Sequence, residues 1–469
     1  YEVVFGDWSS DVCSSDLTQP VLNGISFNFG SYVISSQIKN NSIGGLTAVG
    51  SSNTINTLVK GILTASTSTS NVLVISDNIV GGNSLTNSLI SGTATSTVYH
   101  QVVGIDNGVD GIIEIKNNLI ANLTAYGTGT INTGATTGQT IGIKNTKGTA
   151  NIEGNVIHDL INSYGYYGVT LNLSAMIGIQ QTATNDNIIV KNNTIYNAYA
   201  THASAAVKAH GMLFTCGTTL GTNVVEGNNI YNISVASTSA TAEISGIYIF
   251  GGTAVYKNNM IRLGTDVVNG NPIYGLYQGL GTNVSIYNNN VYIGGTVGNA
   301  SVGKTYAFNR NQTSSNCDVR NNIFSNMRTG TVGTHYAIRI NGATDYTTPY
   351  LTCDYNLYQI GAGAVNKFGQ VTGIDYATME AWNTATNNVF NANSLVDDPL
   401  FVNATTATAD LHLQFNNPAD AKGILIASVT DDFDGQTRSN LTPTDIGADA
   451  GIFDNRSEER RVGKECRSR

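Results

Sequence analysis

An asparagine recurs along most of this chain inside one local pattern, with an apolar residue three positions before it and another two positions after it. Successive asparagines lie 30 to 40 residues apart, which is the length of one unit in many repeat proteins. The ten asparagines are Asn41, Asn78, Asn118, Asn155, Asn193, Asn228, Asn259, Asn289, Asn322 and Asn356. Such a repeat indicates a solenoid, in which each unit packs on its neighbours.

The alternation of apolar residues changes phase at each of these asparagines. Val284 and Ile286 have one parity, whereas Val291 has the other. Because successive side chains of a strand point to opposite faces, both runs can face a core only if the chain bends at Asn288-Asn289. Asparagine suits such a bend because it tolerates left-handed backbone. In coils stacked about 4.8 Å apart, the same asparagine recurs above itself, which predicts a ladder of side-chain hydrogen bonds.

A second strand precedes each bend and is marked by a small residue followed by an apolar one. The small residues are Gly104, Gly142, Gly178, Gly211, Gly246, Gly275, Ala307 and Ala337. Together with the runs on either side of the asparagine, this predicts three short strands per coil and an all-β fold. The pattern resembles the right-handed parallel β-helix of pectate-lyase-like proteins from Gly30 to Tyr358. That resemblance implies the architecture, but not one activity, because the fold carries lyases, hydrolases and adhesins alike.

The two ends differ in composition from everything between them. The tract 456–469, RSEERRVGKECRSR, resembles a translated sequencing adapter, and GDWSSDVCSSDL at 6–17 resembles its partner, to which 1–5 is assigned as well. We therefore exclude 1–17 and 456–469 from the fold. The remainder is expected to be a fragment of a longer product, with a β-helix at 18–358 and a closing segment at 359–455.

The closing segment has no repeat period. A short helix is expected from Asp375, as N-cap, to about Thr384. The later motifs DDPLFVN, DLHLQ and DDFDGQTRSNLTPTDIGADAG resemble the C-terminal segment of secreted bacterial β-helix proteins, particularly those of Bacteroidota, and are expected to cover the open last coil.

Within that segment, Asp431, Asp432 and Asp434 precede Gly435. They are candidate oxygen ligands for calcium. The alternative is a tight turn whose carboxylates are held by Arg438. No other cofactor is predicted.

Composition excludes several classes of function. The formal net charge of −9 gives no basic footprint for nucleic acid, and no apolar run is long enough to span a membrane. Three cysteines, Cys216, Cys317 and Cys353, lie between the terminal tracts. Their spacing does not match a metal site, and their odd number does not indicate a disulfide framework. Cys317 and Cys353 are expected to stack as core thiols. The abundance of Asn, Thr, Ser, Gly and Tyr favours an extracellular or cell-surface protein, which we expect to be a monomer.

The position two residues before each ladder asparagine is expected to face outward. Along successive coils it is Lys116, Glu153, Lys191, Glu226 and Lys257, followed by Tyr287, Arg320 and Asp354. Alternating charges one coil apart predict a surface ladder of ion pairs, worth about 0.2 to 1 kcal/mol a step. The alternative is that Lys191 is the base of a lyase.

Other catalytic candidates are His202 and His210. His210-Gly211 echoes one polygalacturonase motif, but the carboxylate motifs of that family are absent, as are the arginine and calcium clusters of pectate lyases. Like His158, these histidines are isolated in the sequence, and a lone histidine is more often structural.

The longest connections follow Asn118 and Asn155, and long loops often carry function. Tyrosines gather there, and aromatic rings suit the apolar faces of sugars. The expected carbohydrate-binding residues are Tyr164, Tyr166, Tyr167, Tyr196 and Tyr199. The predicted function is a surface module that binds polysaccharide or acts as an adhesin or structural element. The alternative is a polysaccharide lyase or glycoside hydrolase.

Overall fold

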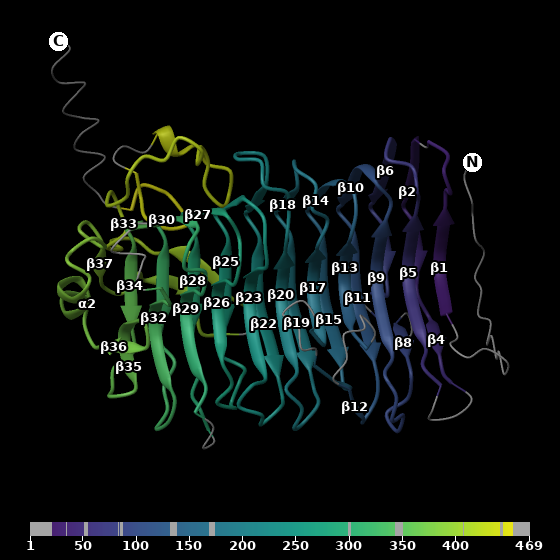
Figure 1. Ribbon diagram of the computed structural model, residues 1–469, viewed down its shortest axis with the longest axis horizontal. Helices are drawn as coiled ribbons and strands as arrows, with labels where there is room; N and C mark the ends of the chain where they lie inside the picture. The colour runs from purple at the N-terminus through teal and green to yellow at the C-terminus, as the bar shows by residue number, and fades with distance from the viewer. Residues whose placement is uncertain are drawn as a thin grey trace, which may run out of the picture.

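The computed structural model describes residues 21–33, 35–50, 55–82, 84, 88–131, 138–167, 174–298, 302–342, 350–406, 408–440 and 444–453. Both adapter-like tracts lie outside these residues. The described chain winds into a row of stacked coils, with the N-terminal coils at one end and the C-terminal coils at the other (Figure 1). The predicted parallel β-helix with three strands per coil is confirmed, because each coil adds one strand to each of three parallel sheets.

Sheet A, the 12-stranded sheet, is parallel except for the β35–β36 pair. Its strands are β1 (Val21–Asn28), β5 (Leu58–Ala65), β9 (Gln101–Gly108), β13 (Thr140–Asn145), β17 (Met176–Gln181), β20 (Lys208–Phe214), β23 (Glu243–Ile249), β26 (Ile273–Gln278), β29 (Lys304–Arg310), β32 (Thr334–Ile340), β35 (Asn366–Val371) and β36 (Ile374–Tyr376). The coils therefore continue beyond Tyr358, where the sequence period ends.

Sheet B has ten strands, which end just before the ladder asparagines. They are β2 (Ser35–Lys39), β6 (Asn71–Ser76), β10 (Gly111–Lys116), β14 (Thr149–Glu153), β18 (Ile189–Lys191), β21 (Val224–Glu226), β24 (Ala254–Lys257), β27 (Asn283–Tyr287), β30 (Asn316–Arg320) and β33 (Leu351–Asp354).

Sheet C has thirteen strands and begins just after the asparagines. They are β3 (Ser42–Ile43), β4 (Leu46–Ala48), β7 (Ile79–Val80), β8 (Leu89–Ser91), β11 (Leu119–Ala125), β15 (Val156–Asn162), β19 (Thr194–Ala200), β22 (Asn229–Val235), β25 (Met260–Leu263), β28 (Asn290–Ile293), β31 (Ile323–Asn326), β34 (Leu357–Ile360) and β37 (Leu395–Val396). A small parallel pair, β12 (Thr130–Ile131) with β16 (Gly165–Tyr166), lies outside the three sheets.

The asparagine ladder is confirmed along its whole predicted length. Each side-chain amide donates to Oδ1 of the next ladder asparagine over 2.9 to 3.0 Å. The backbone N–H of each one donates to the same oxygen. The last, Asn356, donates instead to Oγ of Ser394 over 3.0 Å. The ladder thus satisfies a polar corner inside the core.

The left-handed residue at the bend is the one before the ladder asparagine, as at Asn258, Asn288 and Asn321. Two coils use Gly154 and Gly227 at this position. The bend is therefore divided between two residues, one that supplies the backbone conformation and one that supplies the hydrogen bonds.

The small residues of sheet A stack in a column, and a bulky side chain there would strike both the next coil and the core. A Cβ on Gly142 would lie 2.6 Å from the carbonyl oxygen of Gly178 and 2.5 Å from Cγ2 of Ile157. Val102 and Ile105 both pack in the main core, whereas Val103 belongs to a separate cluster outside it. On a straight strand, residues 102 and 105 would point to opposite faces. Because both point inward here, the strand must bend at Gly104.

The two core cysteines are buried on neighbouring coils, but they do not stack on each other. Cys317 lies opposite Leu351, and Cys353 lies opposite Val319. The expected stacking of the two thiols was wrong, because Cys353 lies two residues along its strand from Leu351, the residue opposite Cys317.

The last coil is closed by residues 366–396. The indole of Trp382, on helix α2 (Met379–Ala385), is buried and packs edge-on against Phe368. The N-cap of this helix is Thr378, whose side chain accepts from the N–H of Ala381. The expected N-cap Asp375 was wrong, because it lies in β36 and accepts hydrogen bonds from Tyr336 and Gln370.

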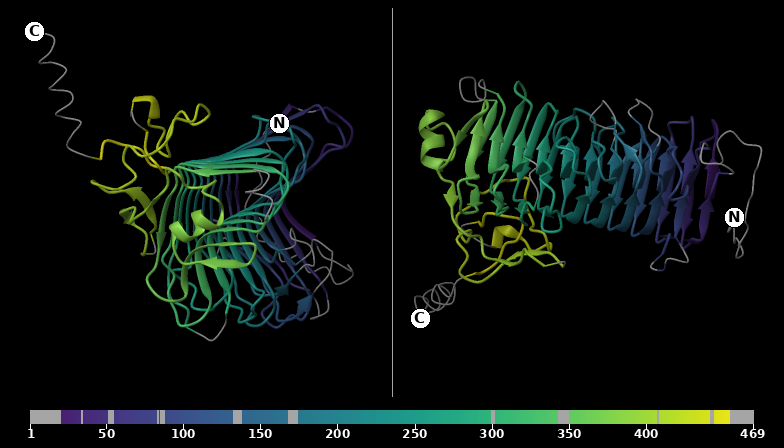
Figure 2. Two further views of the ribbon diagram at one scale, coloured as in Figure 1. Left: turned by 60° about the vertical axis from the view of Figure 1, so that its left-hand side comes forward. Right: turned by 90° about the horizontal axis from the view of Figure 1, so that it is seen from below.

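The described residues 397–406, 408–440 and 444–453, here called the flanking segment, do not cover the last coil as expected. They run back along one side of the stack, as the yellow chain in Figure 2 shows. Asparagines in the left-handed backbone conformation hold the flanking segment against the coils. Asn258 donates to the Asp431 carbonyl over 2.7 Å, and Asn321 donates to the Ile424 carbonyl over 2.7 Å. The segment includes the antiparallel pair β38 (Phe401–Asn403) and β39 (Asp410–Leu413) and the short 3-10 helix η2 (Arg438–Asn440).

Candidate functional site

The outward face of sheet A is concave because its strands from β9 to β32 bend at the column of small residues. Two outward residues flank each bend: one comes just before the small residue, and the other comes two positions after it. They are three residues apart, so on a straight strand their side chains would point to opposite faces. Here they meet: the rings of Tyr274 and Tyr277 stack with centroids 4.6 Å apart. We call the two columns of outward residues on either side of the bend the concave strip. It runs along the axis of the stack.

Over the early coils the concave strip carries charges in place of aromatic rings. Asp106 lies 2.7 Å from Nζ of Lys60 and 3.9 Å from Nζ of Lys144. All three side chains are at most 17 % exposed. A carboxylate between two ammonium groups leaves one positive charge in excess.

Over the middle coils the strip is aromatic and largely buried. His210 stacks on Tyr248, with ring centroids 5.3 Å apart, and its Nδ1 is hydrogen-bonded to Oγ of Ser245. Burial, with a smaller contribution from Lys208, lowers the pKa of His210 to about 3, so the ring is neutral at neutral pH. Its Nε2 and the Tyr248 hydroxyl are buried without a hydrogen-bond partner among the described residues.

Over the last coils the strip combines stacked tyrosines with cations. Tyr306 stacks on Tyr336, with centroids 5.0 Å apart. The Arg339 guanidinium lies 5.6 Å from the Tyr306 ring, and the Lys304 ammonium lies 5.9 Å from the Tyr336 ring. Lys367 is the partner of Tyr336 on the next strand. These five residues are called the cation–tyrosine cluster below.

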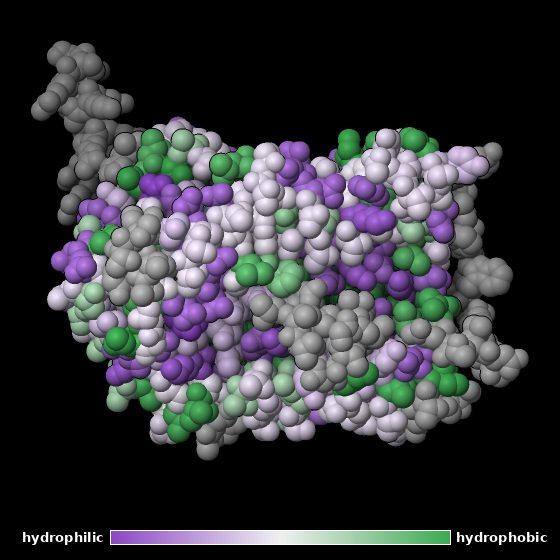
Figure 3. Space-filling view, viewed as in Figure 1, coloured by the Kyte–Doolittle hydropathy of each residue, from purple (hydrophilic) through white to green (hydrophobic). Residues whose placement is uncertain are grey.

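Side-chain hydrogen bonds fix the position of Arg339. Its guanidinium donates to Asn309, Asn341 and Gln370 over 2.9 to 3.1 Å, all through neutral amide oxygens. Among the described residues, no carboxylate therefore neutralises Arg339 directly. Hydrophilic side chains gather over β29 and β32 on this face of the molecule (Figure 3).

The structure separates the three catalytic candidates. Lys191 lies on the outside of sheet B, 3.0 Å from Glu153, within the predicted charge ladder. Lys116 and Lys257 make the neighbouring contacts, to Glu153 at 3.8 Å and to Glu226 at 3.0 Å. The arrangement is a repeated surface feature rather than a convergent acid–base site.

The two histidine candidates are not brought to Lys191. Nδ1 of His202 accepts from the backbone N–H groups of Ser204 and Ala205 and so caps a local turn. Only His210 lies in the concave strip, on sheet A.

The expected tyrosine platform at the long loops is wrong for its first two members. Tyr164 is 3 % exposed and Tyr166 is fully buried. Tyr164 packs over a glycine, since a Cβ on Gly127 would lie 2.7 Å from its ring. Tyr167 is half-buried and packs against the core. Part of this loop region, 132–137 and 168–173, lies outside the described residues.

The remaining two tyrosines lie on the outside of sheet C, and both are half-buried. Tyr196 is sandwiched between His158 and Tyr231, with ring centroids at 4.8 and 5.0 Å. The Tyr199 hydroxyl accepts from Asn232 over 2.8 Å. Because its neighbours cover both faces of Tyr196, that ring has no free face for a sugar.

The calcium candidates form the predicted turn. Oδ1 of Asp432 accepts from the backbone N–H groups of Asp434 and Gln436, over 3.1 and 2.7 Å. Arg438 binds carbonyl oxygens, including those of Gly447 and Ala448 at 2.8 Å, rather than the expected carboxylates. Asp431, Asp432 and Asp434 therefore do not converge on one point.

The structure instead brings Asp434 to two residues that the sequence analysis did not select. His412, Asp434 and Asp449 present one nitrogen and two carboxylates whose ligand atoms lie within 4.8 Å of one another. The three residues come from β39, the turn after Asp432, and the end of the flanking segment. No spacing in the sequence links them.

Comparison with known proteins gave no further guide to the site: no family model, no curated protein and no solved structure matches this chain. Within the described residues, no helix is long and apolar enough to cross a membrane.

Proposed function

We propose that this protein binds a linear acidic polysaccharide along the concave strip of sheet A, outside the cell or at its surface. The observation that carries the proposal is the cation–tyrosine cluster. Lys304, Arg339 and Lys367 stand together on a chain whose net charge is −9, with Asp375 as the carboxylate hydrogen-bonded to Tyr336. A concave surface that concentrates one sign of charge attracts ligands of the opposite sign.

The geometry of the rings favours recognition by charge and hydrogen bonds rather than by sugar stacking. Tyr306 and Tyr336 are 5 % and 0 % exposed and cover each other's faces. By contrast, Lys304 is exposed, and Arg339 and Lys367 are partly exposed. Guanidinium and ammonium groups pair with carboxylates and sulfates, so a polymer of uronate or sulfated sugars fits better than a neutral glucan.

The direction of the strip supports a linear ligand. Successive coils place equivalent residues about 4.8 Å apart along the axis, and a polymer can therefore meet similar groups over many coils. The charges of Lys60 and Lys144 over the early coils, with Asp106 between them, extend the cationic character beyond the cluster. The composition, rich in Asn, Thr, Ser, Gly and Tyr, is our reason for the extracellular location.

The test is affinity for polygalacturonate, measured by retardation in native gels, with a neutral glucan as the comparison polymer. A triple variant, Lys304→Gln, Arg339→Gln and Lys367→Gln, removes three contacts worth about 0.5 to 1 kcal/mol each, so affinity should fall roughly 10- to 100-fold. The wild-type affinity should also weaken with added salt.

A matched control variant removes three positive charges from sheet B, away from the concave strip. Lys39, Lys116 and Lys191 occupy equivalent outward positions at the ends of sheet B strands. Changing all three to Gln should leave retardation unchanged. Equal loss in both triples would mean that net charge alone governs binding and would refute the assignment. Unsaturated products absorbing in the near ultraviolet would support the lyase alternative.

A further inference from the structure

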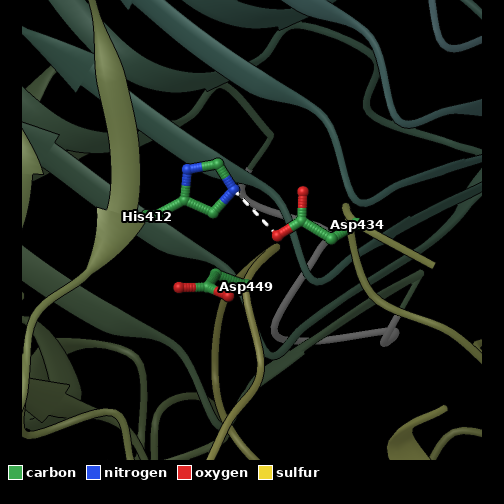
Figure 4. A group of neighbouring side chains, drawn as sticks. All are labelled: His412, Asp434 and Asp449. Atoms are coloured by element: carbon green, nitrogen blue, oxygen red, sulfur yellow. Dashed lines mark ion pairs between the residues drawn. The ribbon is translucent and has the colours of Figure 1, made fainter. Parts of the chain in front are cut away.

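The flanking segment contains a group of side chains whose chemistry is not explained by packing. His412 on β39 points toward Asp434 and Asp449 (Figure 4). Its Nε2 lies 3.2 Å from Oδ2 of Asp434, yet this nitrogen is buried and makes no hydrogen bond among the described residues. Asp449 is 6 % exposed. A buried nitrogen directed at two carboxylates is an unusual arrangement for residues that serve only to pack.

The other ring nitrogen of His412 is already fixed. Nδ1 lies 2.5 Å from Oδ1 of Asp410, and the backbone N–H of His412 donates to the same oxygen over 3.0 Å. When Nδ1–H donates to a carboxylate, the lone pair of the neutral ring is on Nε2. A carboxylate behind a histidine in this way is the usual support of a metal-bound imidazole, because it sets both the tautomer and the orientation of the ring.

We propose that His412, Asp434 and Asp449 bind one divalent transition-metal ion, with zinc preferred, and that Asp410 positions the histidine. One nitrogen and two carboxylate oxygens suit zinc, whereas calcium prefers a shell of oxygens alone. The fourth position is left for water. The site is distinct from the concave strip and does not depend on the polysaccharide proposal.

The distances allow such a site after a small contraction. Bonds of about 2.0 to 2.1 Å in a tetrahedron place ligand atoms roughly 3.3 Å apart. The separation between His412 Nε2 and Asp434 Oδ2, 3.2 Å, already matches. The full group spans up to 4.8 Å, so one carboxylate must move by roughly 1.5 Å from that span to the tetrahedral edge. Asp434 is 45 % exposed on its turn and is the ligand with room to move.

Charge favours the ion as well. Asp410, Asp434 and Asp449 surround a single imidazole, so three carboxylates share at most one positive charge within this group. A divalent ion bound to Nε2 would add two positive charges, which balances the cluster more completely.

The three ligands join parts of the flanking segment that are distant in sequence. Asp434 follows the turn that Asn258 holds through the Asp431 carbonyl, and Asp449 accepts from the N–H of Leu413 over 2.7 Å. A bound ion adds a link among these pieces. Its expected role is to fasten the flanking segment against the side of the coils.

The experiment is zinc titration of the full chain by calorimetry after chelator treatment, with accessible thiols blocked by alkylation so that Cys13 and Cys466 do not bind the ion. The expected result is one zinc per chain and a melting temperature that rises with zinc but not with magnesium.

Two variants and two controls decide the site. His412→Gln and Asp434→Asn should each weaken zinc binding at least tenfold. Asp434→Asn preserves the side-chain shape of an exposed turn residue, so a loss of zinc binding in this variant would not result from misfolding. His202→Gln and Asp431→Asn should bind zinc like the wild type. Absence of stoichiometric binding in the wild type, or unchanged binding in His412→Gln, would overturn the proposal.

Discussion

Replacing Asn193 with alanine tests how the solenoid satisfies its polar corner. Asn193 lies in the middle of the ladder and is fully buried. Its Oδ1 accepts from the backbone N–H and the side-chain amide of Asn155, over 3.0 and 2.9 Å. Its Nδ2 donates to the carbonyls of Ile152 and Lys191 and to Oδ1 of Asn228.

The cost follows from the hydrogen bonds that buried groups lose. In Asn193→Ala, the backbone N–H of Asn155 loses its acceptor, and the carbonyl of Ile152 loses the amide of Asn193 as a donor. The Asn155 amide keeps its bond to the Ile115 carbonyl, and Asn228 Oδ1 keeps the Asn193 N–H. With two buried groups affected at about 1 to 3 kcal/mol each, the free energy of unfolding should fall by roughly 2 to 5 kcal/mol.

The assay is urea denaturation followed by circular dichroism, with hydrogen exchange to locate the effect. Asn41→Ala is the matched control, because Asn41 is the first ladder residue and its Oδ1 has no earlier ladder asparagine below it. Its amide donates to Lys39 and Asn78, so the loss should be about 1 kcal/mol. Equal destabilisation by the two variants, or an unchanged midpoint for Asn193→Ala, would refute the ladder as a source of stability.

Three further substitutions probe other parts of the fold by the same denaturation assay. Gly142→Ala should cost about 1 to 3 kcal/mol, because the added Cβ meets the Gly178 carbonyl at 2.6 Å; a stable variant would contradict the close stacking. Lys191→Ala should cost under about 1 kcal/mol, since it loses one half-exposed ion pair. Arg328→Met should cost roughly 3 kcal/mol or more, because four carbonyls lose this buried donor, and a neutral result would argue against that role.

The coils were predictable from sequence because their interactions recur at the repeat period. An inward residue such as Asn193 meets its own equivalent on the next coil, so periodicity alone places its partner. The flanking segment has no such rule. Its contacts, such as Asn321 with Ile424, join a periodic position to an aperiodic one more than 100 residues away. No local pattern specifies that pairing.

The concave strip was missed for a related reason. Strict alternation assigns residues three apart to opposite faces, so the sequence pattern alone does not join Tyr336 to Arg339 across the bend. The signal was present in one column of sheet A, which reads Tyr274, Tyr306, Tyr336 and Lys367 along successive strands. The first three of these stand just before the small residue. Loop length instead favoured Tyr164, which packs inward.

Hydrogen exchange with and without oligogalacturonate tests the location of ligand binding most directly. We expect the oligosaccharide to slow exchange in peptides covering β29, β32 and β35, where Lys304, Arg339 and Lys367 lie. Exchange in β14 and β18 of sheet B should be unchanged. Protection confined to sheet B or to the outside of sheet C, or no protection at ligand concentrations that retard the protein in gels, would contradict binding on the concave strip.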